Sequence, residues 1–266
     1  MSGPPGDYLL LALRTPTLPP ASHTNAWIVP DGQGGVAVVD PGAPEPDEQA
    51  RLLGLLDRLA AQGRPLRAVW LTHAHPDHVG AVAAVVERRG VPVRGHRLLG
   101  ARLGMPVLPV AEGERLGRFR VLETPGHARE HLSFLDLETG ALVCGDMAST
   151  VSTIVIDPPE GDMAEYVRQL ERLGRLATGA LCPGHGPPAP DAARTLEEAV
   201  AHRRAREALV LAALEVPGTL EEITGRAYAD APAAALPAAA RSCLAGLLKL
   251  RGEGRARERA GIWNAS

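Results

Sequence analysis

Residues 71–80 gather four side chains that can bind a metal ion or move a proton. They are His73, His75, Asp77 and His78, all within six residues. None of these residue types is a preferred core residue. Because His73 and His75 are two positions apart, they point the same way in extended chain, whereas Asp77 and His78 follow on a turn and point elsewhere. One short peptide is therefore predicted to serve two adjacent metal positions.

Three later segments each end a hydrophobic stretch with a histidine or an aspartate beside a glycine. These ends are TPGH at His127, CGD at Asp146 and PGHG at His185. Strands of a layered sheet deliver their ends to one edge, so distant segments can supply one site. Glycine beside each ligand lets the backbone turn tightly. The candidate metal ligands are His73, His75, Asp77, His78, His127, Asp146 and His185.

A site rich in imidazole with added carboxylates suits zinc, and iron or manganese also fits. Two such ions, about 3.5–4 Å apart, would share a water and lower its pKa, which yields hydroxide near neutral pH. The hydroxide would attack a carbonyl or phosphoryl centre, and the metals would stabilise the developing oxyanion. Asp77 is the candidate catalytic residue that orients the hydroxide or takes its proton. The predicted chemistry is hydrolysis without a serine or cysteine nucleophile.

Hydrophobic periodicity predicts an α/β chain that positions these residues at strand ends. Leucines at helical spacing mark the helix before the histidine cluster, and a second helix follows the cluster. Residues 98–114 have no clear period and are expected to form a loop over the site. Strands are expected at 8–14, 26–30, 36–40, 66–71, 91–94, 119–123, 132–137, 141–144 and 179–182. Helices are expected at 47–62, 81–89, 163–176, 191–214, 219–227 and 236–250, with a wing at 256–263.

Several residues near these ligands have two interpretations. Asp40 and Thr72 are equally well read as groups that orient ligands or as turn residues at strand ends. His131 lies four residues after His127 and is a second candidate catalytic residue. A role in holding the metal ligands in place is favoured over direct binding of a metal by His131. Cys144 and Cys182 lie on apolar strands and are expected to be buried core residues.

The motifs HAHPDH, TPGHAREH, CGD and PGHG, in this order, resemble the metallo-beta-lactamase superfamily over about the first 190 residues. The resemblance implies a four-layer αββα sandwich with the metals at one edge. It also implies roles for the ligands. His73, His75 and His127 would hold the first metal, Asp77, His78 and His185 the second, and Asp146 would bridge both. Glu130 stands where the family often has glycine, which puts the local pocket shape in question.

The C-terminal region resembles the winged-helix tail of the beta-lactamase-like protein 2 branch of this superfamily. It contains LEEITGRAYAD and AARSCLAGLLKLRGEG. Two domains are predicted, a catalytic domain at 1–199 and a winged-helix-like domain at 200–266. The tail carries ten Arg and Lys against seven Asp and Glu. A packing or lid role, or a homodimer interface, is favoured over sequence-specific DNA binding, because its central helix offers few base-reading side chains.

Composition narrows the function. The chain has 266 residues and a net charge of −3, with three Trp, three Tyr and two Phe. Few aromatic platforms and a negative catalytic part favour a small or carrier-bound acyl substrate, an ester or thioester, over single-stranded RNA. A metal-dependent endoribonuclease is the alternative, and a DNA-binding regulator is a third. Three distant cysteines and no apparent signal peptide or membrane span predict a cytoplasmic protein, and the arginine bias predicts a bacterial source.

Overall fold

The structure is a computed structural model that describes residues 3–266. The chain separates into two compact units. The first contains the residues up to Thr124 together with 130–153 and 174–195, and the second contains 125–129, 154–173 and 196–266. The second unit therefore takes in a central part of the chain as well as its C-terminal region. The domain boundary at 199/200 stays a prediction.

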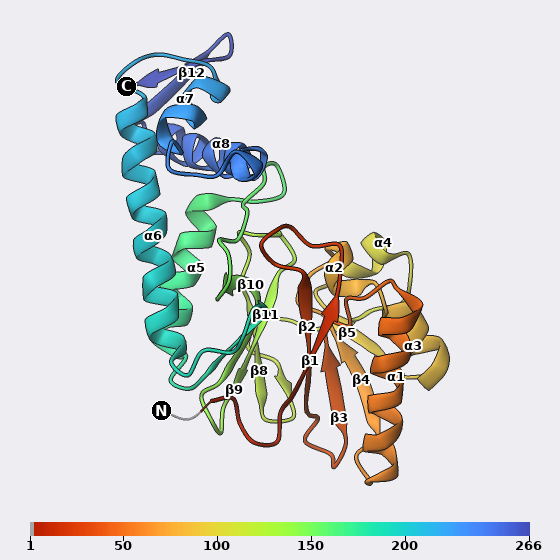
Figure 1. Cartoon of the computed structure of the whole chain (residues 1–266). Helices are drawn as coiled ribbons and strands as arrows, with labels where there is room; N and C mark the ends of the chain where they lie inside the picture. The colour runs from red at the N-terminus through yellow and green to blue at the C-terminus, as the bar shows by residue number, and fades with distance from the viewer. Residues whose placement is uncertain (1–2) are drawn as a thin grey trace. The chain divides into compact units, whose positions relative to one another are not determined.

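Two sheets form the first unit (Figure 1). Within residues 3–266, the first sheet has six strands in sequence order, and the second has five in the order β11-β10-β9-β8-β7. The first consists of β1 (Leu9–Arg14), β2 (His23–Pro30), β3 (Val36–Val39), β4 (Leu66–Trp70), β5 (Val93–Gly95) and β6 (Leu108–Pro109). The second consists of β7 (Arg115–Leu116), β8 (Phe119–Glu123), β9 (Leu132–Asp136), β10 (Leu142–Ser149) and β11 (Leu181–His185).

Helices cover the outer face of the first sheet. The four helices described in this unit are α1 (Pro46–Ala61), α2 (Pro76–Val79), α3 (Val82–Arg89) and α4 (Leu99–Leu103). In α1, Leu52, Leu56 and Leu59 recur on one helical face and are buried. They pack with sheet residues such as Val69 and Leu71 in one core. Because β3, β4 and β5 are parallel, these helices supply the crossovers between them.

A second core lies between the two sheets. Trp27 and Trp70 of the first sheet pack with Phe119, Phe134 and Val143 of the second. The ring centroids of Trp70 and Phe119 lie 5.4 Å apart in an edge-on arrangement. The predicted class, mixed α/β sheets with helices, is confirmed. Buried Cys144 and Cys182 also meet their prediction as core residues.

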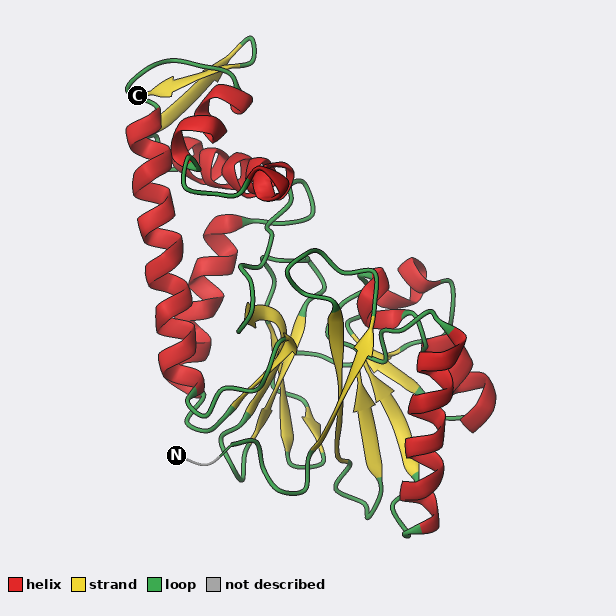
Figure 2. Cartoon of the chain, in the orientation of Figure 1, coloured by secondary structure: helices red, strands yellow, loops and turns green. Residues whose placement is uncertain are grey.

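The second unit is mainly helical and ends in a two-stranded hairpin (Figure 2). Its elements are most of α5 (Met163–Leu176) and of α6 (Ala192–Ala213), together with α7 (Leu220–Ala227), η1 (Ala233–Ala235), α8 (Leu236–Gly252), β12 (Ala256–Arg259) and β13 (Ile262–Ala265). A capping box between Thr219 and Glu222 begins α7. The predicted helices and wing of the C-terminal region are therefore present, around a core that includes Cys243, Leu247 and Trp263.

Three expectations from the sequence differ from the structure. The strands expected at 141–144 and 179–182 run on to Ser149 and His185, so Asp146 and His185 belong to their strands rather than to the turns after them. Residues 98–114 are not a plain loop, because they contain α4 and β6, and Leu99 of α4 is fully buried. Residues 233–252 are long and apolar enough to cross a membrane by length and composition, so the expectation that nothing approaches a span is wrong on those measures. One such helix is weak support for a span, and its buried residues belong to the core of the second unit.

Candidate metal centre

Segments of both sheets and one short helix bring five predicted ligands together in the first unit. His73 follows β4, and Asp77 and His78 lie on the short helix α2. Asp146 lies within β10 and His185 ends β11. These last two strands are parallel, with register shifts on both sides of Gly145. The irregular backbone there lets a strand that is otherwise buried turn a carboxylate toward the histidines.

Four donor atoms converge around one point. Oδ1 of Asp146 lies 3.4 Å from Nε2 of His78 and 3.4 Å from Nε2 of His185. Oδ2 of Asp77 lies 3.5 Å from Nε2 of His185 and 3.9 Å from Nε2 of His78. Ligands of one tetrahedral zinc ion, each bonded at about 2.0–2.1 Å, lie about 3.3 Å from one another. The donor set and its spacing therefore fit a zinc ion.

The electrostatics of this group favour a cation at its centre. Burial acts to lower the pKa of His78, but Asp146 and Asp40 raise it well above its ordinary value. Burial acts likewise on His185, and Asp146 raises its pKa. Burial acts to raise the pKa of Asp146, but His78 and His185 lower it well below its ordinary value. Protons on the imidazoles and a metal ion are therefore alternative partners of the same carboxylate.

Hydrogen bonds orient the imidazole rings so that Nε2 faces the metal position. Nδ1 of His185 donates to the carbonyl oxygen of His23 at 2.9 Å. Nδ1 of His78 contacts Oδ2 of Asp40 at 2.9 Å, and Nδ1 of His73 contacts Oγ1 of Thr72 at 2.9 Å. An imidazole that donates from Nδ1 presents the lone pair of Nε2, the arrangement typical of metal-binding histidines.

Asp40 connects these supports. Its Oδ1 accepts from the backbone N–H of Thr72 at 2.8 Å, and its Oδ2 accepts from Oγ1 of Thr72 at 2.6 Å. The residue has a positive φ of 51°, a backbone conformation that aspartate and asparagine tolerate better than most residues. Asp40, His73 and His78 also have the spacing of a metal group. Because both Asp40 oxygens already accept hydrogen bonds, the geometry favours a ligand-orienting role over the turn-residue interpretation.

Replacing Asp40 by asparagine is expected to lower zinc affinity about 10–100-fold, because asparagine keeps the φ angle but loses the charge that holds His78 and Thr72. Zinc titration against a competing chelator measures the change. Thr72→Ser, which keeps the hydroxyl, is the matched control and should bind zinc like the wild type. If Asp40→Asn binds zinc as tightly as the wild type, Asp40 does not orient the ligands and is only a turn residue.

The first predicted metal position involves two adjacent histidines of the first unit. The ring centroids of His73 and His75 lie 4.6 Å apart, at an interplanar angle of 78°. His73 is fully buried, whereas His75 is partly exposed. The third predicted ligand, His127, belongs to the segment 125–129 of the second unit, where its Nδ1 contacts the carbonyl oxygen of Val155 at 2.9 Å. It therefore shares the Nδ1 arrangement of the predicted ligands His73, His78 and His185.

His131 uses both ring nitrogens in hydrogen bonds. Its Nε2 accepts from the backbone N–H of Asp146 at 3.1 Å, and its Nδ1 contacts Oγ1 of Thr124 at 2.8 Å. The residue is fully buried. The bond to the Asp146 backbone favours a role in positioning this carboxylate, as expected from the sequence. Its further assignment as a catalytic residue stays a prediction.

Sequence reasoning missed several side chains that hold the turns of the site. Nδ2 of Asn25 donates to the carbonyl oxygens of Pro183 at 2.9 Å and Gly186 at 2.7 Å, on both sides of His185. Glu130, which is 1% exposed, accepts from the N–H of Ala74 at 3.3 Å and forms an ion pair with Arg102 of α4. The glutamate that replaces glycine at position 130 therefore makes specific contacts. In the sequence, these contacts could have been suspected only from an acidic residue at 130 and an arginine within the segment 98–114.

The helix α8 offers little for reading DNA bases. Ser242 is 6% exposed and its Oγ accepts from the N–H of Ile156 at 3.2 Å. Arg241 pairs with Asp157, and Lys249 pairs with Glu207 and Glu253. Arg241, Ser242 and Lys249 are therefore engaged within their own unit.

Comparisons with known proteins agree with this geometry. Residues 19–185 match the model of the metallo-beta-lactamase superfamily, and residues 219–263 match that of the beta-lactamase associated winged helix domain. A metallo-beta-lactamase family protein of Thermus thermophilus has a similar structure, with a TM-score of 0.77 and 27% identity, covering 98% of this chain and 99% of that one. The winged-helix match confirms the fold expected of the C-terminal region.

Two curated relatives differ in how much they share. A hydroxyacylglutathione hydrolase of Hahella chejuensis is 36% identical over 164 residues, which are 59% of this chain and 59% of that protein. The chain therefore spans less than two thirds of that relative's length. A beta-lactamase-like protein 2 homolog of Caenorhabditis elegans is 26% identical over 224 residues, which are 79% of this chain and 72% of that protein.

Proposed function

Because the chain belongs to the metallo-beta-lactamase superfamily and several of its relatives are named hydrolases, we propose that it is a dinuclear zinc hydrolase that cleaves a thioester. The observation that carries the proposal is the convergence of Asp77, His78, Asp146 and His185, whose donor atoms lie 3.4–3.9 Å apart. This spacing suits ligands of a metal ion better than direct hydrogen bonds between the groups.

Seven side chains would hold two ions. Asp77, His78 and His185 meet the spacing of one metal group. The superfamily resemblance implies that His73, His75 and His127 hold the other ion and that Asp146 bridges the two. Bound zinc would supply a hydroxide near neutral pH and a positive centre for the oxyanion that forms on the thioester carbonyl.

The chain's own residues would orient this chemistry. Oγ1 of Thr24 contacts Oδ2 of Asp77 at 3.4 Å, which holds the carboxylate on the side of His185. Asp77 is the partly exposed acidic ligand, with 14% of its side chain accessible, so it is the group placed to orient a nucleophilic water. Asp146 is held from its backbone by His131. These contacts position the ligands before substrate arrives.

The thioester substrate is proposed from a relative and from charge. The Hahella protein is named for hydrolysis of hydroxyacylglutathione. The chain has a net charge of −3 and only eight aromatic residues, three Trp, three Tyr and two Phe. Extended single-stranded RNA usually needs a positive groove and stacking platforms. A small acyl thioester needs neither. The cytoplasmic location and the homodimer stay predictions.

Steady-state hydrolysis separates these possibilities. The zinc-loaded protein is expected to cleave acyl-glutathione or acyl-coenzyme A thioesters faster than matched oxygen esters, and a chelator should abolish turnover until zinc is restored. Elemental analysis identifies the metal in the protein as purified. His202→Ala, which removes an exposed histidine of α6, is the matched control and should leave both metal content and turnover unchanged.

A labelled unstructured RNA is the competing substrate in the same experiment. Cleavage of this RNA by fully metallated protein, without turnover of any thioester, would replace the proposal with the endoribonuclease alternative. Turnover that survives complete metal removal would contradict a metal-bound hydroxide altogether.

A further inference from the structure

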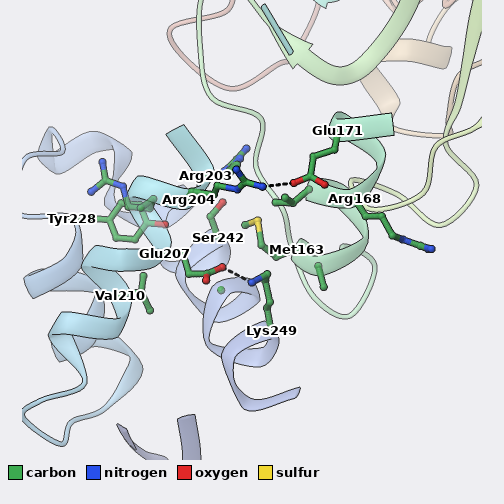
Figure 3. A pocket seen from close by; sticks show the side chains of 14 residues that line it. Met163, Arg168, Glu171, Arg203, Arg204, Glu207, Val210, Tyr228, Ser242 and Lys249 are labelled. Carbon is green, nitrogen blue, oxygen red and sulfur yellow. Dashed lines mark hydrogen bonds and ion pairs between the residues drawn. The ribbon is translucent and has the colours of Figure 1, made fainter. Parts of the chain in front are cut away.

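The second unit contains a pocket of about 290 Å³ that the hydrolase proposal does not use. Its walls come from α5, α6 and α8 together with Tyr228 (Figure 3). All the lining residues belong to the second unit. The volume is at the lower end of the range for small-molecule pockets, about 300–1,000 Å³. It is large enough for one compact group of a metabolite.

The lining of the pocket is predominantly cationic. Five of its side chains are positively charged and two are carboxylates, Glu171 and Glu207. The cations are Arg168, Arg203, Arg204, Arg206 and Lys249. Four of them pair with carboxylates of the second unit, and Figure 3 shows the pairs Arg204–Glu171 and Lys249–Glu207. The exception is Arg203.

Arg203 is a buried positive charge that lacks an anionic partner. It is 7% exposed, and no carboxylate of residues 3–266 lies within ion-pair distance of it. Its Nη2 donates to the carbonyl oxygen of Ile154, and its guanidinium lies 5.1 Å from the ring centroid of Tyr166. A carbonyl and an aromatic ring compensate only part of the cost of burying a charge. A bound anion would supply the missing counter-charge.

Two hydroxyl groups add neutral donors to the same pocket. The hydroxyl of Tyr228 makes no hydrogen bond to any residue that the structure describes, although the side chain is 9% exposed. Burial raises the pKa of Tyr228 to about 12, so its proton is retained at neutral pH. Oγ of Ser242 accepts from the N–H of Ile156, which leaves its hydroxyl hydrogen to donate. In Figure 3 the Tyr228 hydroxyl is turned toward Ser242.

We propose that this pocket binds the phosphate monoester group of a small metabolite. The planar fork of Arg203 matches two phosphate oxygens, and the hydroxyls of Tyr228 and Ser242 can donate to a third. The group could belong to a free nucleotide or to the 3′-phosphate end of a coenzyme A thioester. The proposal does not depend on which substrate the metal centre hydrolyses.

Binding to the full-length, metal-loaded protein tests the pocket. Titration calorimetry in phosphate-free buffer would compare AMP, coenzyme A, inorganic phosphate and uncharged adenosine. We expect saturable binding of AMP or coenzyme A and none of adenosine. Binding of coenzyme A but not of AMP would show that the phosphate group recognised by the pocket belongs to a thioester substrate. Equal binding of coenzyme A and AMP would show that the pocket recognises the phosphate group alone. Each bound ligand should also raise the melting temperature.

Two pocket variants and one control locate the binding. Tyr228→Phe removes one unpartnered hydroxyl, so it should keep the wild-type melting temperature and weaken the ligand about tenfold. Arg203→Gln should abolish binding or weaken it about a hundredfold. Arg257→Gln, on the exposed hairpin, should change nothing. The proposal is overturned if no phosphate ligand binds at millimolar concentration, or if Tyr228→Phe and Arg203→Gln, both folded, bind like the wild type, which would place the phosphate at the metals.

Discussion

Asp146→Asn is expected to lower thioester hydrolysis by at least about a thousandfold, because the stabilisation lost with a metal ion amounts to several kcal/mol of the activation barrier. Oδ1 of Asp146 lies 3.4 Å from Nε2 of both His78 and His185. Asparagine has the same size but offers a neutral oxygen, so it should not hold two cations close together. Bound zinc should fall from two ions per chain to one or none.

Metal content and rate are measured on the same sample, with circular dichroism to verify the fold. Asp57→Asn is the matched control, because Asp57 lies on the surface of α1 with its side chain 59% exposed and pairs with Arg89. It should retain both ions and full turnover. If Asp146→Asn keeps two ions and hydrolyses thioesters at the wild-type rate, the bridging role of Asp146 is wrong.

Gly42→Ala is expected to cause the second-largest loss of activity, through the backbone of the turn that carries the predicted ligands Asp77 and His78. A Cβ atom at position 42 would lie 1.7 Å from the carbonyl oxygen of Asp77 and 3.3 Å from Cα of His78. No side chain can move to relieve this clash, so the segment that carries both ligands must shift. Overpacking of this kind costs about 1–3 kcal/mol of the free energy of unfolding. A shift of both ligands should also weaken zinc binding and lower turnover.

Chemical denaturation and zinc titration measure the two effects. Gly54→Ala provides a matched glycine control within helix α1, where a Cβ would meet only the end of Arg58 at 3.7 Å. Alanine is favoured over glycine there, so this variant should be more stable by about 0.5–1 kcal/mol and bind zinc normally. Wild-type stability and zinc affinity in Gly42→Ala would contradict the close approach of the two turns.

Local pattern was enough to predict most elements of this chain. Leu52, Leu56 and Leu59 recur at helical spacing, and they form the buried face of α1. The apolar runs that lead to His73 and His185 were also predicted as strands, because each is short and is followed by glycine or proline, although β11 continues through Pro183 to His185. The prediction of a loop at residues 98–114 was wrong because this segment lacks such a pattern. Their helix and strand are only five and two residues long, so packing of Leu99 rather than periodicity decides them.

The sequence by itself determined the chemistry of the candidate centre, because residue type decides which side chains can bind a metal. Only the tertiary structure decided how they are held. Asp40 supports His78 from 38 positions away, and the carbonyl of His23 supports His185 from 162 positions away. The burial of the Arg203 charge likewise could not be predicted from the sequence, because Arg203 lies among other arginines that are typical of a solvent-exposed helix face. Hydrogen bonding and burial depend on contacts between distant segments, and no local spacing encodes them.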